Sequence, residues 1–132
     1  MGLALSIGGI DFEDDRIPFA QWPDRKPGTP FGCIPVLEVD GQEVTQSNGI
    51  NRYVGKLAGL YPEDPLQAAF CDEAMDVIEE IAGVVLGTFS IEDEQEKKAA
   101  REAIAAGPLT RYFGNLGQRL SARGGTWFAD DR

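Results

Sequence analysis

Two short β-rich runs joined by an Asp-Gly pair constrain the fold of this chain more than any other feature. The first run covers residues 36–39 and the second covers residues 43–45, with Asp40-Gly41 between them. Asp-Gly between apolar runs is a strong hairpin signal, because a type I′ turn needs positive φ angles that glycine adopts freely. The sequence therefore predicts an antiparallel hairpin over residues 36–45.

A proline precedes this hairpin and a helical pattern follows it. Pro35 stands at the first position of a strand, where a missing N–H is least costly, and X-Pro bonds are the ones that adopt the cis form at modest cost. Ser47 is placed to cap the helix that follows. The apolar residues of that helix recur at i, i+3, i+4 and i+7, which predicts one buried face: Ile50, Tyr53, Val54 and Leu57. The N-terminus of such a helix suits a bound carboxylate, because it offers free N–H groups and a positive dipole end.

A hairpin followed by a helix occurs in many α/β domains, so these motifs alone leave the function open. The wider stretch from Trp22 to Ser47 adds further features in a fixed order. They are the Trp22 and Lys26 pair, the Ile34-Pro35 step, the hairpin, and Gln46-Ser47 at the helix start. In this order and spacing the stretch resembles the glutathione site of a cytosolic glutathione transferase, most closely of the sigma class.

This resemblance implies a role for each residue of the stretch. In that family the strand after a cis-proline presents main-chain groups to the cysteinyl unit of glutathione, which points here to Ile34 with Pro35. A Gln-Ser pair that opens the third helix holds the γ-glutamyl carboxylate, and a Trp and a Lys in the preceding loop hold the glycyl carboxylate. The corresponding residues are Gln46 with Ser47, and Trp22 with Lys26.

The resemblance extends over nearly the whole chain and implies its fold. We expect an α/β thioredoxin-like half that lacks its first strand, residues 1–58, and then an all-α helical half, residues 65–132. Residues 10–17 are similar to the family's second strand. The chain resembles a family member clipped at both ends. The Tyr that activates the thiol in that family has no counterpart here, so no catalytic residue is assigned and we expect little or no conjugating activity.

The helical half has an apolar stripe and an acidic stripe. The apolar stripe begins after Pro65, a suitable first helical residue, and comprises Leu66, Phe70, Ala74, Val77, Ile78, Ile81 and Val85. The acidic stripe comprises Asp72, Asp76, Glu79 and Glu80. Further along, Gly107-Pro108 is expected to break a helix, and a last helix is expected to bury Leu109, Tyr112, Phe113, Leu116 and Leu120.

The acidic stripe by itself is typical of a solvated helix face. The resemblance implies instead a homodimer across this helix, in which Glu80, with Asp76 second, reaches the γ-glutamyl amine held by the partner. Arg52 would pair with the stripe across the dimer. We expect no metal requirement, although some relatives hold a divalent ion among such acids, and carboxylates at Asp76, Glu79 and Glu80 suit Mg²⁺ or Ca²⁺.

Composition excludes several other functions. The net charge of −10 and the pI near 4.3 argue against nucleic acid, because phosphate binding needs clustered Lys and Arg. No apolar run approaches the roughly 20 residues of a membrane span. With no His there is neither a Ser-His triad nor a His-ligated metal site. Cys33 and Cys71 form no C-x-x-C pair, so Cys33 is interpreted as a structural thiol, with a redox role as the alternative.

These inferences lead to one expected function and one alternative. The expected protein is cytoplasmic and binds glutathione, which it conjugates to a small electrophile or uses in an isomerisation. The alternative is a non-catalytic structural or interaction protein, like the lens crystallins derived from this family, or an inactive fragment.

Overall fold

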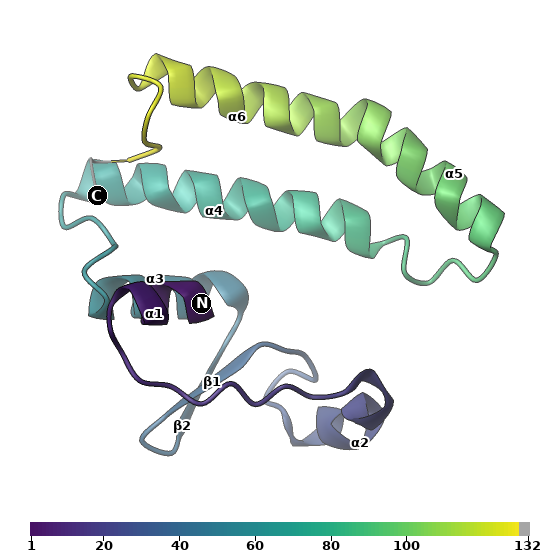
Figure 1. Cartoon of the computed structure of the whole chain (residues 1–132), viewed down its shortest axis with the longest axis horizontal. Coiled ribbons are helices and arrows are strands. Elements are labelled where there is room, and N and C mark those ends of the chain that lie inside the picture. The colour runs from purple at the N-terminus through teal and green to yellow at the C-terminus, as the bar shows by residue number, and fades with distance from the viewer. Residues whose placement is uncertain (130–132) are drawn as a thin grey trace. The chain divides into compact units, whose positions relative to one another are not determined.

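The computed structural model describes residues 1–129, and the chain divides into two compact units, Met1–Tyr61 and a second that begins at Pro62 (Figure 1). The first unit contains α1 (Gly2–Ile7), α2 (Trp22–Arg25), β1 (Val36–Val39), β2 (Gln42–Thr45) and α3 (Ser47–Leu57). Two short 3₁₀ turns, Phe19–Gln21 and Lys26–Gly28, flank α2. The second unit contains α4 (Pro65–Leu86), α5 (Glu94–Ile104) and α6 (Thr110–Ala122).

The hairpin forms as the sequence predicts. Strands β1 and β2 pair antiparallel, with Val36 opposite Thr45 and Leu37 opposite Val44. Asp40 and Gly41 have φ angles of 51° and 75°, which are the two positive values that a type I′ turn requires. The Ile34-Pro35 bond that leads into β1 is cis.

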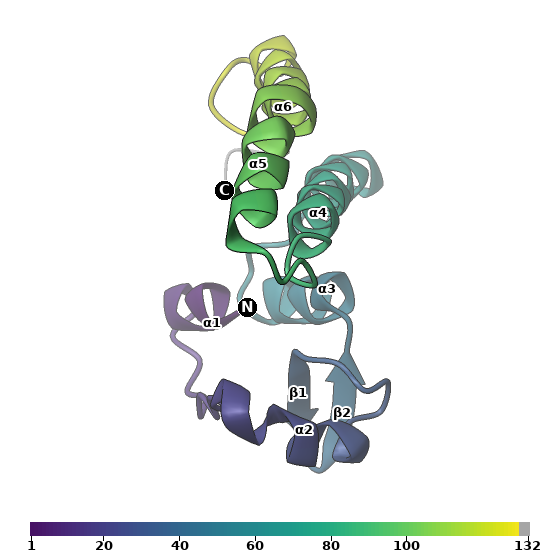
Figure 2. The same ribbon diagram turned by 90° about the vertical axis from the view of Figure 1, so that its right-hand side faces the viewer.

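The core of the first unit lies between the hairpin and two helices, α1 and α3. Leu5, Ile50 and Val54 are buried, and the partly buried Leu37 and Val44 of the hairpin pack against them. Figure 2 shows α1 and α3 side by side, and these helices are in contact. The approach of the two segments is close at Gly8, where a β-carbon would lie 2.6 Å from that of Ala58. This small core fixes the hairpin and the start of α3 relative to one another.

Three expectations for the first unit are wrong. Residues 10–17 form no strand. A strand needs a partner for its backbone groups, and the sheet of the described residues contains β1 and β2 alone. Ser47 is the first residue of α3 rather than its cap, and the capping position belongs to Gln46, whose side chain makes no capping hydrogen bond. Tyr53 and Leu57, expected on the buried face, are 40% and 55% exposed.

Two helices of the second unit, α4 and α5, begin at aspartate caps. The Asp64 carboxylate accepts hydrogen bonds from the N–H groups of Leu66 and Gln67, at 3.0 and 2.9 Å, and the Asp93 carboxylate accepts one from Glu96 at 2.8 Å. These three bonds satisfy donors that a helix start leaves without intrahelical partners. Ile81 of α4 is buried, whereas Leu66 and Ile78 of the predicted stripe are more than half exposed.

The predicted break at Gly107-Pro108 is also wrong, because the helix continues through it. Residues Ala105–Leu109 form one π-helical turn that joins α5 to α6, with Pro108 inside it, and Figure 1 shows the ribbon running on through this point. Proline lacks the N–H that an α-helix would use there, and the wider turn accommodates the loss. The Thr110 hydroxyl donates to the Ala105 carbonyl at 2.8 Å. Of the expected buried face of α6, Phe113 is 57% exposed.

Within the described residues, no helix is both long enough and apolar enough to span a membrane.

Candidate functional site

The start of α3 carries the most unusual backbone geometry in the first unit. Gln46 has φ 70° and ψ 119°, a combination that side chains with a β-carbon rarely adopt. The chain turns sharply at Gln46 from β2 into α3, and the Gln46 carbonyl accepts the first helical hydrogen bond from Ile50, at 3.0 Å. Strain of this kind, typically about 1–3 kcal/mol, persists where the surroundings enforce it and clusters at binding sites.

No local sequence pattern predicts this geometry, although the residues involved were predicted as part of the site. Gln is not among the residues that favour positive φ, so nothing local would mark position 46. The core under α3 fixes one end of the turn and the pairing of β2 fixes the other. The backbone of Gln46 must therefore adopt the φ and ψ angles that connect them. Ser47 follows at the first helical position, where it is half-buried.

The Ile34-Pro35 step leads into β1, and because Val36 pairs with Thr45, this step lies at the same end of the hairpin as Gln46. Ile34 is 55% exposed and Pro35 is half-buried. The edge of β1 that does not face β2 has no strand beside it among residues 1–129.

Trp22 and Lys26 come from the helical turns that precede this step. Trp22 opens α2, and Lys26 opens the 3₁₀ turn behind it. The Lys26 carbonyl accepts hydrogen bonds from the N–H and the hydroxyl of Thr29, at 3.1 and 2.8 Å. The Lys26 stem runs over Gly32, where a β-carbon would lie 3.4 Å from Cε. Lys26 thus lies against the loop that leads to Ile34-Pro35.

The structure brings some of the predicted residues together and leaves others untested. Lys26 adjoins the loop before Pro35, and Gln46 adjoins Ser47. The convergence of Trp22 and Lys26 with Gln46 and Ser47 on one cleft stays a prediction. Cys33, in the same loop, is a half-buried free thiol.

The acidic face of α4 belongs to the second unit. Asp76, Glu79 and Glu80 are exposed, and the Tyr112 hydroxyl of α6 donates to Glu80 Oε2 at 3.0 Å. Arg52 of α3 is half-buried. Across the described part of the chain, no group of three or more His, Cys, Asp or Glu is arranged to hold a metal ion, which gives the divalent-ion alternative no support.

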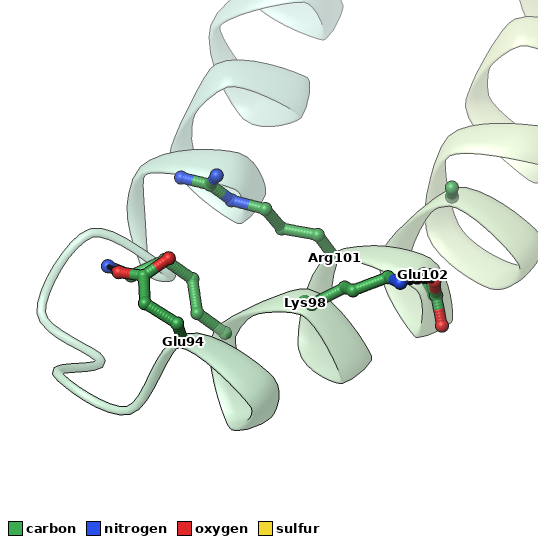
Figure 3. A pocket seen from close by; sticks show the side chains of 6 residues that line it. Glu94, Lys98, Arg101 and Glu102 are labelled. Atoms are coloured by element: carbon green, nitrogen blue, oxygen red, sulfur yellow. Dashed lines mark hydrogen bonds and ion pairs between the residues drawn. The ribbon is translucent and has the colours of Figure 1, made fainter.

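A hollow on α5 has chemistry of another kind (Figure 3). Its lining consists of charged side chains and one alanine along a single helix: Glu94, Lys97, Lys98, Arg101, Glu102 and Ala105. Lys97 bonds Glu94 at 2.7 Å, and this bond holds the pKa of Glu94 below its ordinary value. Lys98 pairs with Glu102 in the same way, and Arg101 donates to the Thr88 hydroxyl. Because its charges already have partners, we interpret the hollow as a solvated helix face.

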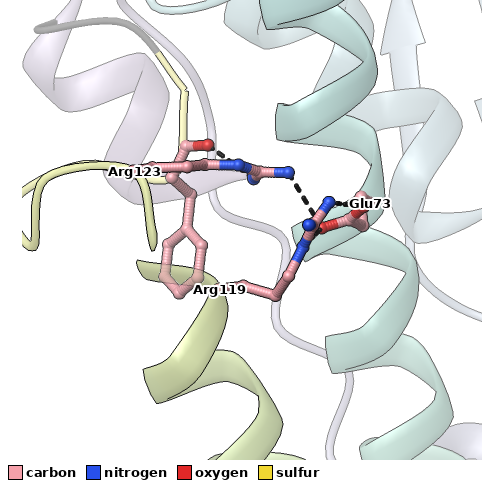
Figure 4. Close-up of polar contacts among 4 residues, drawn as sticks. Glu73, Arg119 and Arg123 are labelled. Carbon is pink, nitrogen blue, oxygen red and sulfur yellow. Dashed lines mark hydrogen bonds and ion pairs between the residues drawn. The ribbon is translucent and has the colours of Figure 1, made fainter. Parts of the chain in front are cut away.

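A cluster of charged side chains joins α4 to α6 and to the segment after α6 (Figure 4). Arg119 donates two hydrogen bonds to the Glu73 carboxylate, at 2.8 and 2.7 Å. Arg123 donates to the same carboxylate at 3.1 Å and to the Phe128 carbonyl at 2.8 Å, and it lies over the Phe70 ring. The hydrogen bonds from Arg119 lower the pKa of Glu73, against a smaller effect of burial. This cluster is structural, and the sequence did not predict it.

No family model matches the chain. Glutathione S-transferase 2 of Manduca sexta is 40% identical over 94 residues, which cover 71% of this chain and 45% of that protein. The chain spans about half the length of the curated relatives it matches.

Solved structures agree over almost the full chain. Prostaglandin synthase D of Nilaparvata lugens has a TM-score of 0.87 at 35% identity, and the match covers 98% of this chain and 64% of that one. A sigma class GST of Fasciola hepatica has a TM-score of 0.81 at 23% identity, over 99% of this chain and 64% of that one, which compares the folds alone. In sequence and in fold, this chain is related to the glutathione S-transferases.

Proposed function

We propose that the chain binds glutathione in its first unit and presents the tripeptide's thiol to a small electrophile, for conjugation or isomerisation. Its relatives named above, a glutathione S-transferase and a prostaglandin synthase D, support this proposal. The observation that carries it is the backbone of Gln46. This residue has a positive φ directly before the N-terminus of α3, the position where the sequence predicts a carboxylate to bind.

The γ-glutamyl carboxylate is assigned to Gln46 and Ser47. The first N–H groups of a helix have no intrahelical acceptors, and its dipole favours an anion. The Ser47 hydroxyl and the Gln46 side-chain amide add donors at the same place. Ser47 is half-buried, so hydrogen bonds to the carboxylate there are partly sheltered from water and are worth roughly 1.5–3 kcal/mol each.

The rest of the tripeptide is assigned to the start of β1 and to the helical turns that precede it. The main chain at Ile34, beside Pro35, would pair with the cysteinyl unit as a neighbouring strand does. Lys26 with Trp22 would hold the glycyl carboxylate. Lys26 is exposed, and an exposed ion pair contributes about 0–1 kcal/mol and weakens in salt.

The chemistry proposed for the bound tripeptide starts from its thiol. The thiol loses its proton to solvent, and the thiolate attacks an electrophilic carbon. A carbon–sulfur bond forms while the bond from that carbon to a leaving group breaks, and the leaving group departs with the electron pair. No residue of the chain is assigned to stabilise that thiolate. The proposal includes a cytoplasmic location, a homodimer, a contact from Glu80 and Asp76 to glutathione held by the partner, and a dimer contact from Arg52. No metal is assigned a role.

Calorimetric titration of the full chain with glutathione tests the proposal. Binding that Ser47→Ala weakens at least tenfold is the expected result. Ser121→Ala is the matched control, because that hydroxyl of α6 bonds the Gly117 carbonyl of its own helix. Absence of binding by the unmodified chain would overturn the proposal. Binding without turnover of an aromatic electrophile would favour the non-catalytic alternative.

A further inference from the structure

The hydrogen bond between Tyr112 and Glu80 joins two helices that lie far apart in sequence. The Tyr112 hydroxyl of α6 donates to Glu80 Oε2 of α4 at 3.0 Å, across 32 residues of sequence. The Arg111 guanidinium lies 5.0 Å from the centre of the Tyr112 ring, a distance at which a cation is attracted to the ring face. The position of the Glu80 carboxylate is therefore set by α6 as well as by its own helix.

This arrangement leaves acceptors open toward solvent. A carboxylate has about four lone-pair sites, and the bond from Tyr112 occupies one of them. The Tyr112 oxygen, having donated its proton, still accepts hydrogen bonds. Glu80 is exposed, and Asp76 and Glu79 lie one helical turn and one residue from it on α4. The pair thus offers two adjacent oxygen acceptors within an acidic face, which suits a primary ammonium group with its three donors.

We propose that Tyr112 is a positioning residue, which holds the Glu80 carboxylate ready for the γ-glutamyl ammonium of glutathione bound by a second copy of the chain. The inference rests on the proposed function. An exposed glutamate samples many rotamers, and fixing them on binding reduces affinity. The bond from Tyr112 restricts these rotamers before the ligand arrives, so its contribution is to affinity for the ammonium group in particular.

The test compares two ligands by calorimetry on the full chain. One ligand is glutathione, and the other is the same tripeptide with its α-amino group replaced by hydrogen. Tyr112→Phe keeps the aromatic ring and removes the hydroxyl. It should weaken glutathione binding about three- to tenfold, the effect of one hydrogen bond, and leave the affinity for the deaminated ligand unchanged. In a Glu80→Gln background, Tyr112→Phe should have a much smaller effect on glutathione binding.

Matched variants separate positioning from general stability. Glu79→Gln removes a neighbouring carboxylate of α4 and should weaken glutathione binding less than Glu80→Gln does. Thermal unfolding of each variant shows whether the fold is kept. Equal weakening of both ligands by Tyr112→Phe would mean a structural role and overturn the inference.

Two further outcomes distinguish a failure of this inference from a failure of the proposed function. If Glu80→Gln weakens glutathione binding selectively and Tyr112→Phe does not, this inference is wrong while the proposed function stands. If the unmodified chain binds no glutathione, the proposed function and this inference are both wrong.

Discussion

The two units of the chain are stabilised by different means. In the first, Leu5, Ile50 and Val54 form a buried cluster against the hairpin. In the second, Ile81 is buried, and most of the side-chain hydrogen bonds that cross between elements are exposed, those of Glu73 and Glu80 among them. Apolar burial contributes more per residue than exposed ion pairs. The geometry of the proposed glutathione site therefore depends on a few residues beneath α3.

The largest effect should come from the core under α3. Val54 is fully buried, so Val54→Ala should lower the free energy of unfolding of the first unit by about 2–4 kcal/mol. Denaturant unfolding measures this in a Trp127→Phe background, where Trp22 is the remaining tryptophan. Leu57→Ala, at a position 55% exposed on the same helix, is the control and should cost clearly less. A loss below 1 kcal/mol for Val54→Ala would remove the contrast between the units.

The next effect concerns affinity rather than stability. Ser47→Ala should weaken glutathione binding at least tenfold, about 1.4 kcal/mol, since it removes a partly sheltered donor to a carboxylate. Lys26→Ala should weaken binding less, and its effect should disappear in high salt. Calorimetric titrations at low and high salt decide between them. Equal losses, or a larger loss for Lys26→Ala, would mean that the anchor of the tripeptide lies elsewhere in the first unit.

Relief of the backbone strain at Gln46 should change stability and glutathione binding in opposite directions. Gln46→Gly removes the β-carbon that makes a positive φ costly, and should raise the free energy of unfolding of the first unit by about 1 kcal/mol. The same change removes a proposed ligand of the γ-glutamyl carboxylate and should weaken glutathione binding. Denaturant unfolding and calorimetry of one preparation give both values. A Gln46→Gly variant that is less stable than the unmodified chain would refute the assignment of strain to this residue.

The smallest effect should come from the polar cluster of the second unit. The pKa of Glu73 is lowered by hydrogen bonds from Arg119, so its contribution to stability is present above the unfolded pKa of about 4.5 and is lost as pH falls through the lower folded value. Glu73 is 42% exposed, which limits this contribution to about 1 kcal/mol or less. The midpoint temperature of thermal unfolding should therefore fall less steeply between pH 6 and pH 3 for Glu73→Gln than for the unmodified chain.

The control for this last prediction is Glu92→Gln, which removes an exposed carboxylate from the connection before α5. It should leave the acid dependence of unfolding unchanged. An acid dependence that is identical in Glu73→Gln and the unmodified chain would show that the cluster adds nothing to stability.

Several elements were determined by the sequence alone, because their signals are local. The Asp40-Gly41 turn and the first turn of α4 after Asp64 need no information from elsewhere in the chain. The same holds for the buried positions Ile50 and Val54, whose spacing defines one helix face. The family resemblance was also readable, since the residues that carry it lie within one continuous stretch, from Trp22 to Ser47.

Other features were decided by tertiary structure. An extended segment becomes a strand when a neighbour pairs with it, and residues 10–17 have none among the described residues. A proline usually ends a helix unless packing against another element keeps the chain helical. Here α4 contacts both the π turn at Pro108 and α6, and the helix continues. The φ of Gln46 and the bond from Tyr112 to Glu80 likewise depend on segments distant in sequence. No local pattern encodes them, because their free energy comes from contacts that exist only after the chain has folded.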